Sequence, residues 1–330
     1  MKKISLFLAL LTGSLLTAAQ ETSVLFIGNS FTFMNNMPYM FRDIAVANGR
    51  EVHVDTLIHG GKDLNFHANR AATYEKIKSR KWDYIIIQAS SNELAQPDSK
   101  VAQLSLPFAR RIVDSIRAEN RCTQVMLYMT WAYKYGNPNW APIASYDSMQ
   151  YRVKRQYLRL ASTLDAKVAP VGAVWSSVRA NHSDINLYDP DNHHPTAAGS
   201  YISACTFYAS IFSETPVGNK AVIEGVDEKT RTVIEKLAFK DVFGNLKEWR
   251  LLPDADAMKT GFEYTVKNDV LKINNTSANA SAVEWDFGDG HTSSEKEPEY
   301  CYSSKGTYKV TQKVKNSCKT SYLVKQVEIK

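Results

Sequence analysis

Cysteine is scarce in this chain, and no long apolar run follows its first residues. Four cysteines among 330 residues are too few for a disulfide scaffold, and the sequence alone does not settle whether Cys301 and Cys318 pair. No segment after residue 19 has the roughly 20 apolar residues that cross a bilayer, so we predict no transmembrane segment. The 40 basic and 34 acidic residues are scattered along the chain, which argues against nucleic acid as a partner.

The first 19 residues have the pattern of a secretory signal peptide. Two lysines precede an apolar run over residues 4–16, and small residues at 17–19 fit a cleavage site. We therefore expect a signal peptide that is cleaved after residue 19, and a protein that is secreted, periplasmic or held at the cell surface.

Residues 20–240 alternate between predicted strands and helices. Short runs rich in Val and Ile are typical of buried parallel strands, and they occur at residues 24–27, 52–57, 84–88, 125–129 and 168–171. Helical periodicity separates them, as over residues 101–119. This alternation predicts an α/β domain on a doubly wound, five-stranded parallel sheet. Such sheets place their sites beyond the carboxyl ends of the strands.

Residues 261–330 follow a different pattern. Apolar and polar residues alternate with period two, as in half-buried antiparallel strands, over residues 262–266, 282–286 and 306–314. The stretch before them contains Gly244 and Pro253. We therefore predict a linker over residues 241–260 and a small all-β sandwich over residues 261–330.

A serine directly follows the first predicted strand. Ser30 lies in the segment Phe-Ile-Gly-Asn-Ser-Phe-Thr, in which Gly28 lets the backbone turn sharply. The fold aims Ser30 at the carboxyl edge of the sheet, where it can act as a nucleophile if a base removes its proton. The alternative is that Asn29 or Ser30 only caps the following helix.

A carboxylate and a histidine lie three residues apart in a second loop, Asp-Pro-Asp-Asn-His-His-Pro, over residues 189–195. On a turn, this spacing lets Asp191 reach the Nδ1–H of His194 and leaves Nε2 to face a serine. Asp191 could instead cap the next helix, and His193 and His194 could bind a metal. Adjacent histidines in an extended loop point in opposite directions and no third ligand stands out nearby, so we predict no metal and no cofactor.

Two further strand ends can serve an oxyanion. A glycine pair follows the second strand, where backbone N–H groups can donate, and Gln-Ala-Ser-Ser-Asn follows the third, where a side-chain amide can donate. Each segment taken alone is an ordinary loop. In this fold, however, all of these segments would converge on one crevice with Ser30, Asp191 and His194.

Residues 23–215 resemble the SGNH, or GDSL-like, hydrolase superfamily in these four ordered segments. The likeness is strongest to bacterial secreted members with an F-I-G-N-S-F-T opening and an H-P-x-x-A-G-S-Y closing segment, here residues 26–32 and 194–201. The resemblance implies a three-layer, flavodoxin-like SGNH-hydrolase fold. It also implies a serine esterase with Ser30 as nucleophile, His194 as base and Asp191 as the acid that orients it.

The resemblance further implies that the N–H groups of Ser30 and Gly61 form an oxyanion hole, with Gly60 as the alternative in register. The family usually has Asp before the serine, where this chain has Asn29.

The third segment departs further, because the family usually has G-x-N-D there. Counting from the strand places Ser90 at the asparagine position. Comparison with the Q-G-E-S-N segment of carbohydrate acetylesterases instead favours Gln88 and Asn92 as oxyanion donors.

The C-terminal region resembles the PKD (polycystic kidney disease) domain. Trp-Asp-Phe-Gly-Asp-Gly over residues 285–290 is its most characteristic segment, and residues 306–310 fit a later strand. The resemblance implies a PKD-like β-sandwich that acts as a spacer or adhesion unit and binds polysaccharide or protein.

These features together predict a secreted carboxylic ester hydrolase that deacetylates a glycan. One alternative is a lipase or thioesterase of the same superfamily, against which the lack of a long apolar lid argues. The other is a non-catalytic glycan-binding or adhesion protein that retains the fold, which the altered third segment favours and the intact Ser30, Asp191 and His194 argue against.

Overall fold

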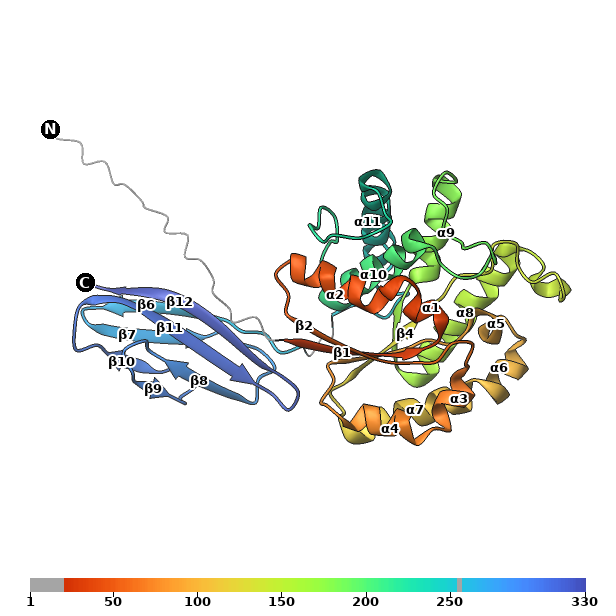
Figure 1. Cartoon of the computed structure of the whole chain (residues 1–330). Helices are drawn as coiled ribbons and strands as arrows, with labels where there is room; N and C mark the ends of the chain where they lie inside the picture. Colours follow the sequence, from red (N-terminus) through yellow and green to blue (C-terminus); the bar gives the residue numbers. More distant parts are fainter. Residues whose placement is uncertain (1–20, 254–256) are drawn as a thin grey trace. The chain divides into compact units, whose positions relative to one another are not determined.

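The computed structural model describes residues 21–253 and 257–330 (Figure 1). The predicted signal peptide, residues 1–19, lies outside the described residues. The chain divides into two compact units, Gln20–Leu252 and Pro253–Lys330, each with its own apolar core. Of the helices in the described ranges, none is long and apolar enough to cross a membrane.

The first unit is built on a five-stranded parallel sheet in the order β2-β1-β3-β4-β5. Its strands are β1 (Thr22–Gly28), β2 (Val52–Ile58), β3 (Tyr84–Ile87), β4 (Gln124–Tyr128) and β5 (Lys167–Ala169). Since β1 pairs with both β2 and β3, the direction of winding reverses at β1, and a crevice is expected at the carboxyl ends of β1 and β3. The predicted fold class is confirmed.

Helices cover both faces of this sheet. They are α1 (Ser30–Phe33), η1 (Met34–Asn36), α2 (Met37–Ala47), α3 (Leu64–Ala68), α4 (Ala71–Lys78), α5 (Ser91–Leu94), α6 (Asp98–Leu104), α7 (Leu106–Glu119), η2 (Ala141–Ile143), α8 (Tyr146–Leu164), α9 (Val171–Asn181), α10 (Ala197–Phe212) and α11 (Glu228–Phe243). Figure 1 shows α2, α10 and α11 on one face and α3, α4 and α7 on the other. Nearly every residue of α10 is buried, so its N-cap, Thr196, has a fixed position.

The predicted linker over residues 241–260 is wrong in its first half. α11 runs to Phe243, and Trp249 and Leu251 are buried in the core of the first unit. The Trp249 carbonyl accepts a hydrogen bond of 2.9 Å from the Val168 amide, at the edge strand β5. Burial of these apolar side chains outweighs the turn signals of Gly244 and Pro253, so the first unit extends to Leu252.

The second unit consists of two antiparallel sheets. One has the order β10-β7-β6 and the other the order β12-β11-β8-β9. The strands are β6 (Phe262–Lys267), β7 (Val270–Asn275), β8 (Ala282–Asp286), β9 (Thr292–Ser293), β10 (Glu299–Cys301), β11 (Gly306–Lys315) and β12 (Thr320–Ile329). Trp285 and Phe287, from the motif of residues 285–290, lie in the core. The thiol of Cys301 is free, so the Cys301–Cys318 bridge that the sequence left open does not form.

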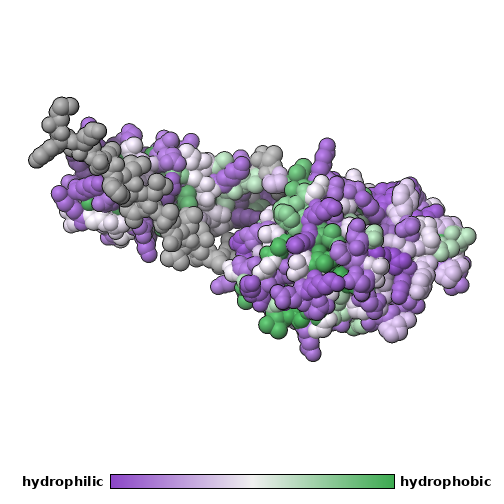
Figure 2. All heavy atoms as spheres, turned by 90° about the horizontal axis from the view of Figure 1, so that it is seen from above, coloured by the Kyte–Doolittle hydropathy of each residue, from purple (hydrophilic) through white to green (hydrophobic). Residues whose placement is uncertain are grey.

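Several large apolar side chains are exposed among the residues that the structure describes. The face of the molecule in Figure 2 is mostly hydrophilic, and its apolar residues lie in small groups. The most exposed of them are Val222, Tyr151 and Tyr135. Single exposed apolar residues of this kind are normal for soluble domains.

Candidate active site

Ser30 is the first residue of α1 and directly follows the carboxyl end of β1. The turn that carries it is capped by Asn29, whose Oδ1 accepts a hydrogen bond of 3.1 Å from the Phe31 amide. The cap is therefore Asn29, which leaves the half-buried Ser30 hydroxyl available for another partner.

Close packing around Gly28 fixes the position of the turn that carries Ser30. A Cβ atom at Gly28 would lie 2.6 Å from both Gln88 Oε1 and Thr32 Oγ1, so only glycine fits. The Gly28 carbonyl accepts hydrogen bonds of 3.0 Å from the His59 amide and from His67 Nε2. Burial lowers the pKa of His67 to about 4, although its bond to Gly28 opposes that shift. His67 is therefore a neutral donor that anchors the turn.

Gln88 does not fit the oxyanion role predicted for it. Its side chain is buried, and its Oε1 accepts from the Asn29 amide at 2.8 Å and from Thr32 Oγ1 at 2.9 Å. Its Nε2 donates to the Ala89 carbonyl at 2.8 Å. Gln88 therefore supports the serine turn from inside the domain, where both its Oε1 and its Nε2 are engaged.

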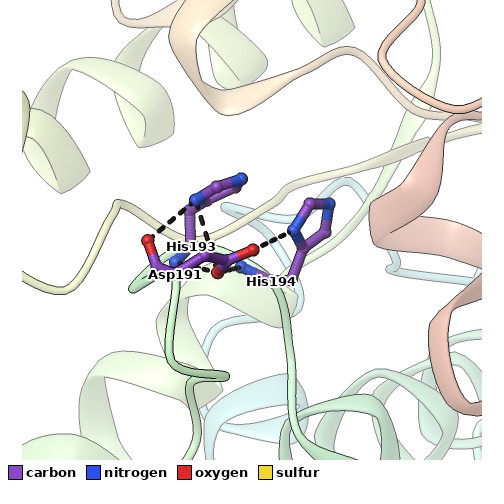
Figure 3. A group of neighbouring side chains, drawn as sticks. All are labelled: Asp191, His193 and His194. Atoms are coloured by element: carbon purple, nitrogen blue, oxygen red, sulfur yellow. Dashed lines mark hydrogen bonds and ion pairs between the residues drawn. The ribbon is translucent and has the colours of Figure 1, made fainter.

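Ser30, His194 and Asp191 form a hydrogen-bonded chain across 164 residues of sequence. His194 Nε2 lies 2.8 Å from Ser30 Oγ, and His194 Nδ1 lies 2.5 Å from Asp191 Oδ2. Figure 3 shows the carboxylate of Asp191 between the two histidines, with its second oxygen turned to the backbone. That oxygen accepts from the amides of His193 and His194 at 3.0 and 2.9 Å.

Asp191 is held in its ionised form. Partial burial alone would raise its pKa, but hydrogen bonds from the His194 ring and from the amides of His193 and His194 outweigh burial and hold the pKa well below its usual range. An ionised carboxylate at this position keeps the proton of neutral His194 on Nδ1. Nε2 is then the nitrogen that can accept a proton from Ser30.

The loop that carries His194 is tied to two other segments. The Asn192 carbonyl accepts from the Lys134 amide at 2.8 Å, and the His193 carbonyl accepts from Trp131 Nε1 at 3.0 Å. On its other side, Asn35 Nδ2 donates to the Pro195 carbonyl at 2.9 Å. These bonds place His194 over the serine turn.

Gly61 lies in a tight turn that follows β2. The Lys62 amide donates to the His59 carbonyl at 3.3 Å, and Gly61 has a φ of +67°, which favours glycine. Asn29 Nδ2 donates to the Lys62 carbonyl at 2.9 Å and so joins this turn to the serine turn. Within the described ranges, the amides of Ser30, Gly60 and Gly61 have no hydrogen-bond acceptor.

The third segment offers Asn92 as an available donor. Ser90, the alternative in register, is the N-cap of α5, and its Oγ accepts from the Glu93 amide at 3.2 Å. The Oδ1 of Asn92 accepts from Asn137 Nδ2 at 3.3 Å. Its own Nδ2 has no acceptor among the residues that the structure describes, which leaves this group free for a ligand.

Asp191, His193 and His194 also have the residue types of a metal site, with one ligand atom from each lying within 4.8 Å of the others. Two atoms that bind the same zinc at 2.0–2.1 Å in a tetrahedron lie roughly 3.3 Å apart. The 2.5 Å contact between Asp191 Oδ2 and His194 Nδ1 is too short for that arrangement. The donor atoms are spaced for hydrogen bonds with one another.

Comparison with family models gives two matches. Residues 69–241, just over half of the chain, match a family described as Domain of unknown function (DUF4886). The chain belongs to the DUF4886 family. Residues 253–330 match the PKD domain. Among curated proteins, none matches the chain.

Solved structures resemble both units. A DUF4886 family protein from Bacteroides uniformis is 19% identical with a TM-score of 0.59, and the match covers 68% of this chain and 95% of that one. A protein from Slackia heliotrinireducens, proposed to be an SGNH hydrolase, is 27% identical with a TM-score of 0.48, over 58% of this chain and all (100%) of that one. The PKD1 domain of the Vibrio cholerae metalloprotease PrtV is 29% identical with a TM-score of 0.22, over 22% of this chain and 96% of that one.

The predicted combination of an α/β domain on a five-stranded parallel sheet with a C-terminal PKD domain is thus confirmed. The DUF4886 match contains Asn92, Asp191 and His194 but begins after Ser30 and Gly61. In this family member, the site therefore combines residues from inside and outside the matched segment.

Sequence reasoning missed the loop between β4 and α8, which supplies Trp131, Lys134 and Asn137. A signal for it was present, because Trp and Thr follow β4 at the same sheet edge as the other site segments. No spacing rule, however, links these residues to a histidine loop that lies some 60 residues further along the chain.

Proposed function

We propose that this protein is a serine esterase that hydrolyses carboxylic esters through an acyl-enzyme. The observation that carries the proposal is the 2.8 Å contact between His194 Nε2 and Ser30 Oγ. The other ring nitrogen of His194 is hydrogen-bonded to ionised Asp191. A hydroxyl, an imidazole and a carboxylate in this order are the elements of a nucleophilic triad.

In the proposed reaction, His194 Nε2 takes the proton of Ser30 as Oγ attacks the ester carbonyl. The electron pair of the C=O bond moves onto oxygen, which accepts hydrogen bonds from the N–H groups of Ser30 and Gly61 and from Asn92 Nδ2. Collapse of this intermediate expels the alcohol, which takes its proton from His194 and leaves an acyl group on Ser30. Water then repeats the sequence and releases the acid. Asp191 stays ionised and stabilises the imidazolium.

The proposed substrate is an acetylated glycan met outside the cytoplasm. Two features support this choice: the predicted signal peptide and the attached PKD domain. The PKD domain would bind the polysaccharide, or a protein attached to it, and hold the esterase near its substrate.

Hydrolysis of 4-nitrophenyl acetate tests the reaction. Ser30→Ala should lower kcat/KM by more than about a thousandfold, because it removes the nucleophile. The exposed Ser79→Ala in the loop after α4 is the matched control and should leave the rate unchanged.

Equal rates for the wild-type protein and Ser30→Ala would instead favour a non-catalytic binding protein. Acetate release from acetylated xylan, measured alongside hydrolysis of long-chain 4-nitrophenyl esters, tests the substrate class. A preference for the long chains would contradict the glycan proposal.

A further inference from the structure

The carboxamide of Asn92 has two possible orientations, and only one of them can serve an oxyanion. With Nδ2 toward the site it donates a hydrogen bond to the developing charge. With Oδ1 toward the site it repels that charge. A neighbouring group must therefore stabilise one of the two orientations over the other.

Asn137 fixes the orientation of the Asn92 carboxamide, because only Asn137 can be the donor in the hydrogen bond between the two side chains. Its Oδ1 accepts a hydrogen bond of 3.1 Å from the Asn139 amide, which can only donate. The Nδ2 of Asn137 must then point the other way, where it donates to Asn92 Oδ1 at 3.3 Å. Nδ2 of Asn92 is the group left over. If Asn92 were rotated by half a turn, two NH2 groups would face each other.

The loop around Asn137 is rigid enough to hold this orientation. The Asn137 amide donates to the Ile143 carbonyl at 2.7 Å, and its carbonyl accepts from the Trp140 amide at 3.2 Å. The preceding Gly136 has a φ of +76°, and a Cβ atom there would lie 2.5 Å from the Ile143 carbonyl oxygen. The loop therefore closes tightly on itself around Asn137.

We propose that Asn137 is a positioning residue that orients Asn92 for oxyanion stabilisation. The inference rests on the proposed esterase function. Asn137 does not touch the reacting atoms; it acts through Asn92. The same loop holds the histidine segment through Trp131 and Lys134, so it aligns the oxyanion donor and the base together.

Kinetics with 4-nitrophenyl acetate in the full chain test the proposal. Asn92→Ala should lower kcat about 100-fold to 1,000-fold, the usual loss for one oxyanion donor. Asn137→Asp still accepts from the Asn139 amide but presents an oxygen to Asn92, which should then turn its Oδ1 to the site. We expect kcat to fall roughly tenfold or more with little change in KM, as for loss of a hydrogen bond to a charged group.

The double variant is decisive. If Asn137 acts only through Asn92, Asn137→Asp should have no further effect in the Asn92→Ala background. Asn139→Asp is the matched control, because it places the same charge two residues away on an exposed side chain and keeps the backbone amide. It should retain wild-type kcat. Asn137→Ala, which adds no charge, should show a smaller loss of kcat, and this loss should likewise disappear in the Asn92→Ala background. It serves as a second test in case the Asp variant does not fold.

Two results would overturn the inference alone: Ser30-dependent activity that Asn137→Asp and Asn137→Ala leave unchanged, or losses that multiply in the double variant. The absence of any Ser30-dependent activity would overturn the proposed function and this inference with it.

Discussion

Asn29 makes a hydrogen bond that an aspartate in its place could not make. Its Oδ1 accepts from the Phe31 amide, as a carboxylate could, but its Nδ2 donates to the Lys62 carbonyl at 2.9 Å. This second bond joins the serine turn to the turn that contains Gly61. Asn29, where the resemblance to SGNH hydrolases leads one to expect Asp, therefore has a structural role in this chain.

We predict that Asn29→Asp destabilises the protein and impairs the site. The variant leaves the Lys62 carbonyl without its donor and turns a carboxylate oxygen toward it, which should lower the free energy of unfolding by about 1–3 kcal/mol. Urea unfolding measures the loss. The exposed Asn36→Asp, which breaks no side-chain cap bond, is the control, and an equal effect of both variants would show that charge alone is responsible.

Glu93, next to Asn92, should make stability depend on pH. Burial raises its pKa from 4.5 to about 7, and nearby Asp63 adds to the shift, while Ser105 and the amides of Leu64 and Ser90 oppose it. Because the folded state holds the proton more tightly, this contribution to stability is complete below pH 4.5 and is lost as the pH rises through 7.

Glu93→Gln should remove this dependence. Relative to wild type, the variant should be more stable at pH 8 than at pH 5 by about 1–3 kcal/mol, measured by urea unfolding at both values. The exposed Glu75→Gln should show no such difference between the two pH values. A flat profile for both variants would mean that Glu93 is ionised in the folded protein at both pH values.

Sequence reasoning at this scale selected side chains that the structure brings together where chemistry and fold position coincide, and it failed where side-chain orientation decides. Ser30, Asp191 and His194 were predicted because a reactive residue type follows a strand end or a turn, and the structure brings them within hydrogen-bond distance. Gln88 follows a strand in the same way, but its side chain points into the core. Neither residue type nor spacing reveals whether an amide side chain points into the core or toward the site.

Among the elements, the loop after β4 supports the histidine segment most directly. Trp131 stacks on Trp175 with ring centroids 4.0 Å apart, and its Nε1 donates to the His193 carbonyl at 3.0 Å. The indole of Trp131 thus connects the core to the loop that carries His193 and His194.

Trp131→Phe should therefore reduce esterase activity more than its size change explains. Loss of the bond to the His193 carbonyl frees the histidine loop, and we expect kcat to fall about tenfold, since one such bond is worth about 1–1.5 kcal/mol. Trp175→Phe removes the same atoms from the same pair of stacked rings, but the Nε1 of Trp175 has no hydrogen-bond partner among the described residues. That control should lose stability and keep its kcat; equal losses of kcat would contradict a role for the hydrogen bond.

Element boundaries were predicted less well than element types. The single helix expected over residues 101–119 is two helices, α6 and α7, which meet at Ser105 just before Pro107. Proline is tolerated in the first turn of a helix but not in its interior, so Pro107 starts a new helix. Apolar periodicity continues across this break, and it therefore predicts the buried face but not the interruption.

In the whole molecule, two separate apolar cores divide the chain at Leu252. The first core contains Trp249, 1% exposed, and Leu251, 6% exposed, which lie beyond the boundary of residue 240 predicted from the sequence. A chain of residues 20–252 should therefore fold by itself and hydrolyse 4-nitrophenyl acetate. A chain of residues 20–240 lacks the indole of Trp249, and it also lacks the backbone hydrogen bond from the Val168 amide to the Trp249 carbonyl.

We expect the shorter chain to be less stable by at least about 3 kcal/mol, the usual loss when a buried tryptophan is removed. Thermal or urea unfolding of the two chains measures this difference, and both lack the PKD domain, so that domain cannot contribute to it. Trp249→Ala in the longer chain should reproduce most of the loss. If both chains unfolded at the same urea concentration, residues 241–252 would be a linker after all, and the burial of Trp249 would have no role in stability.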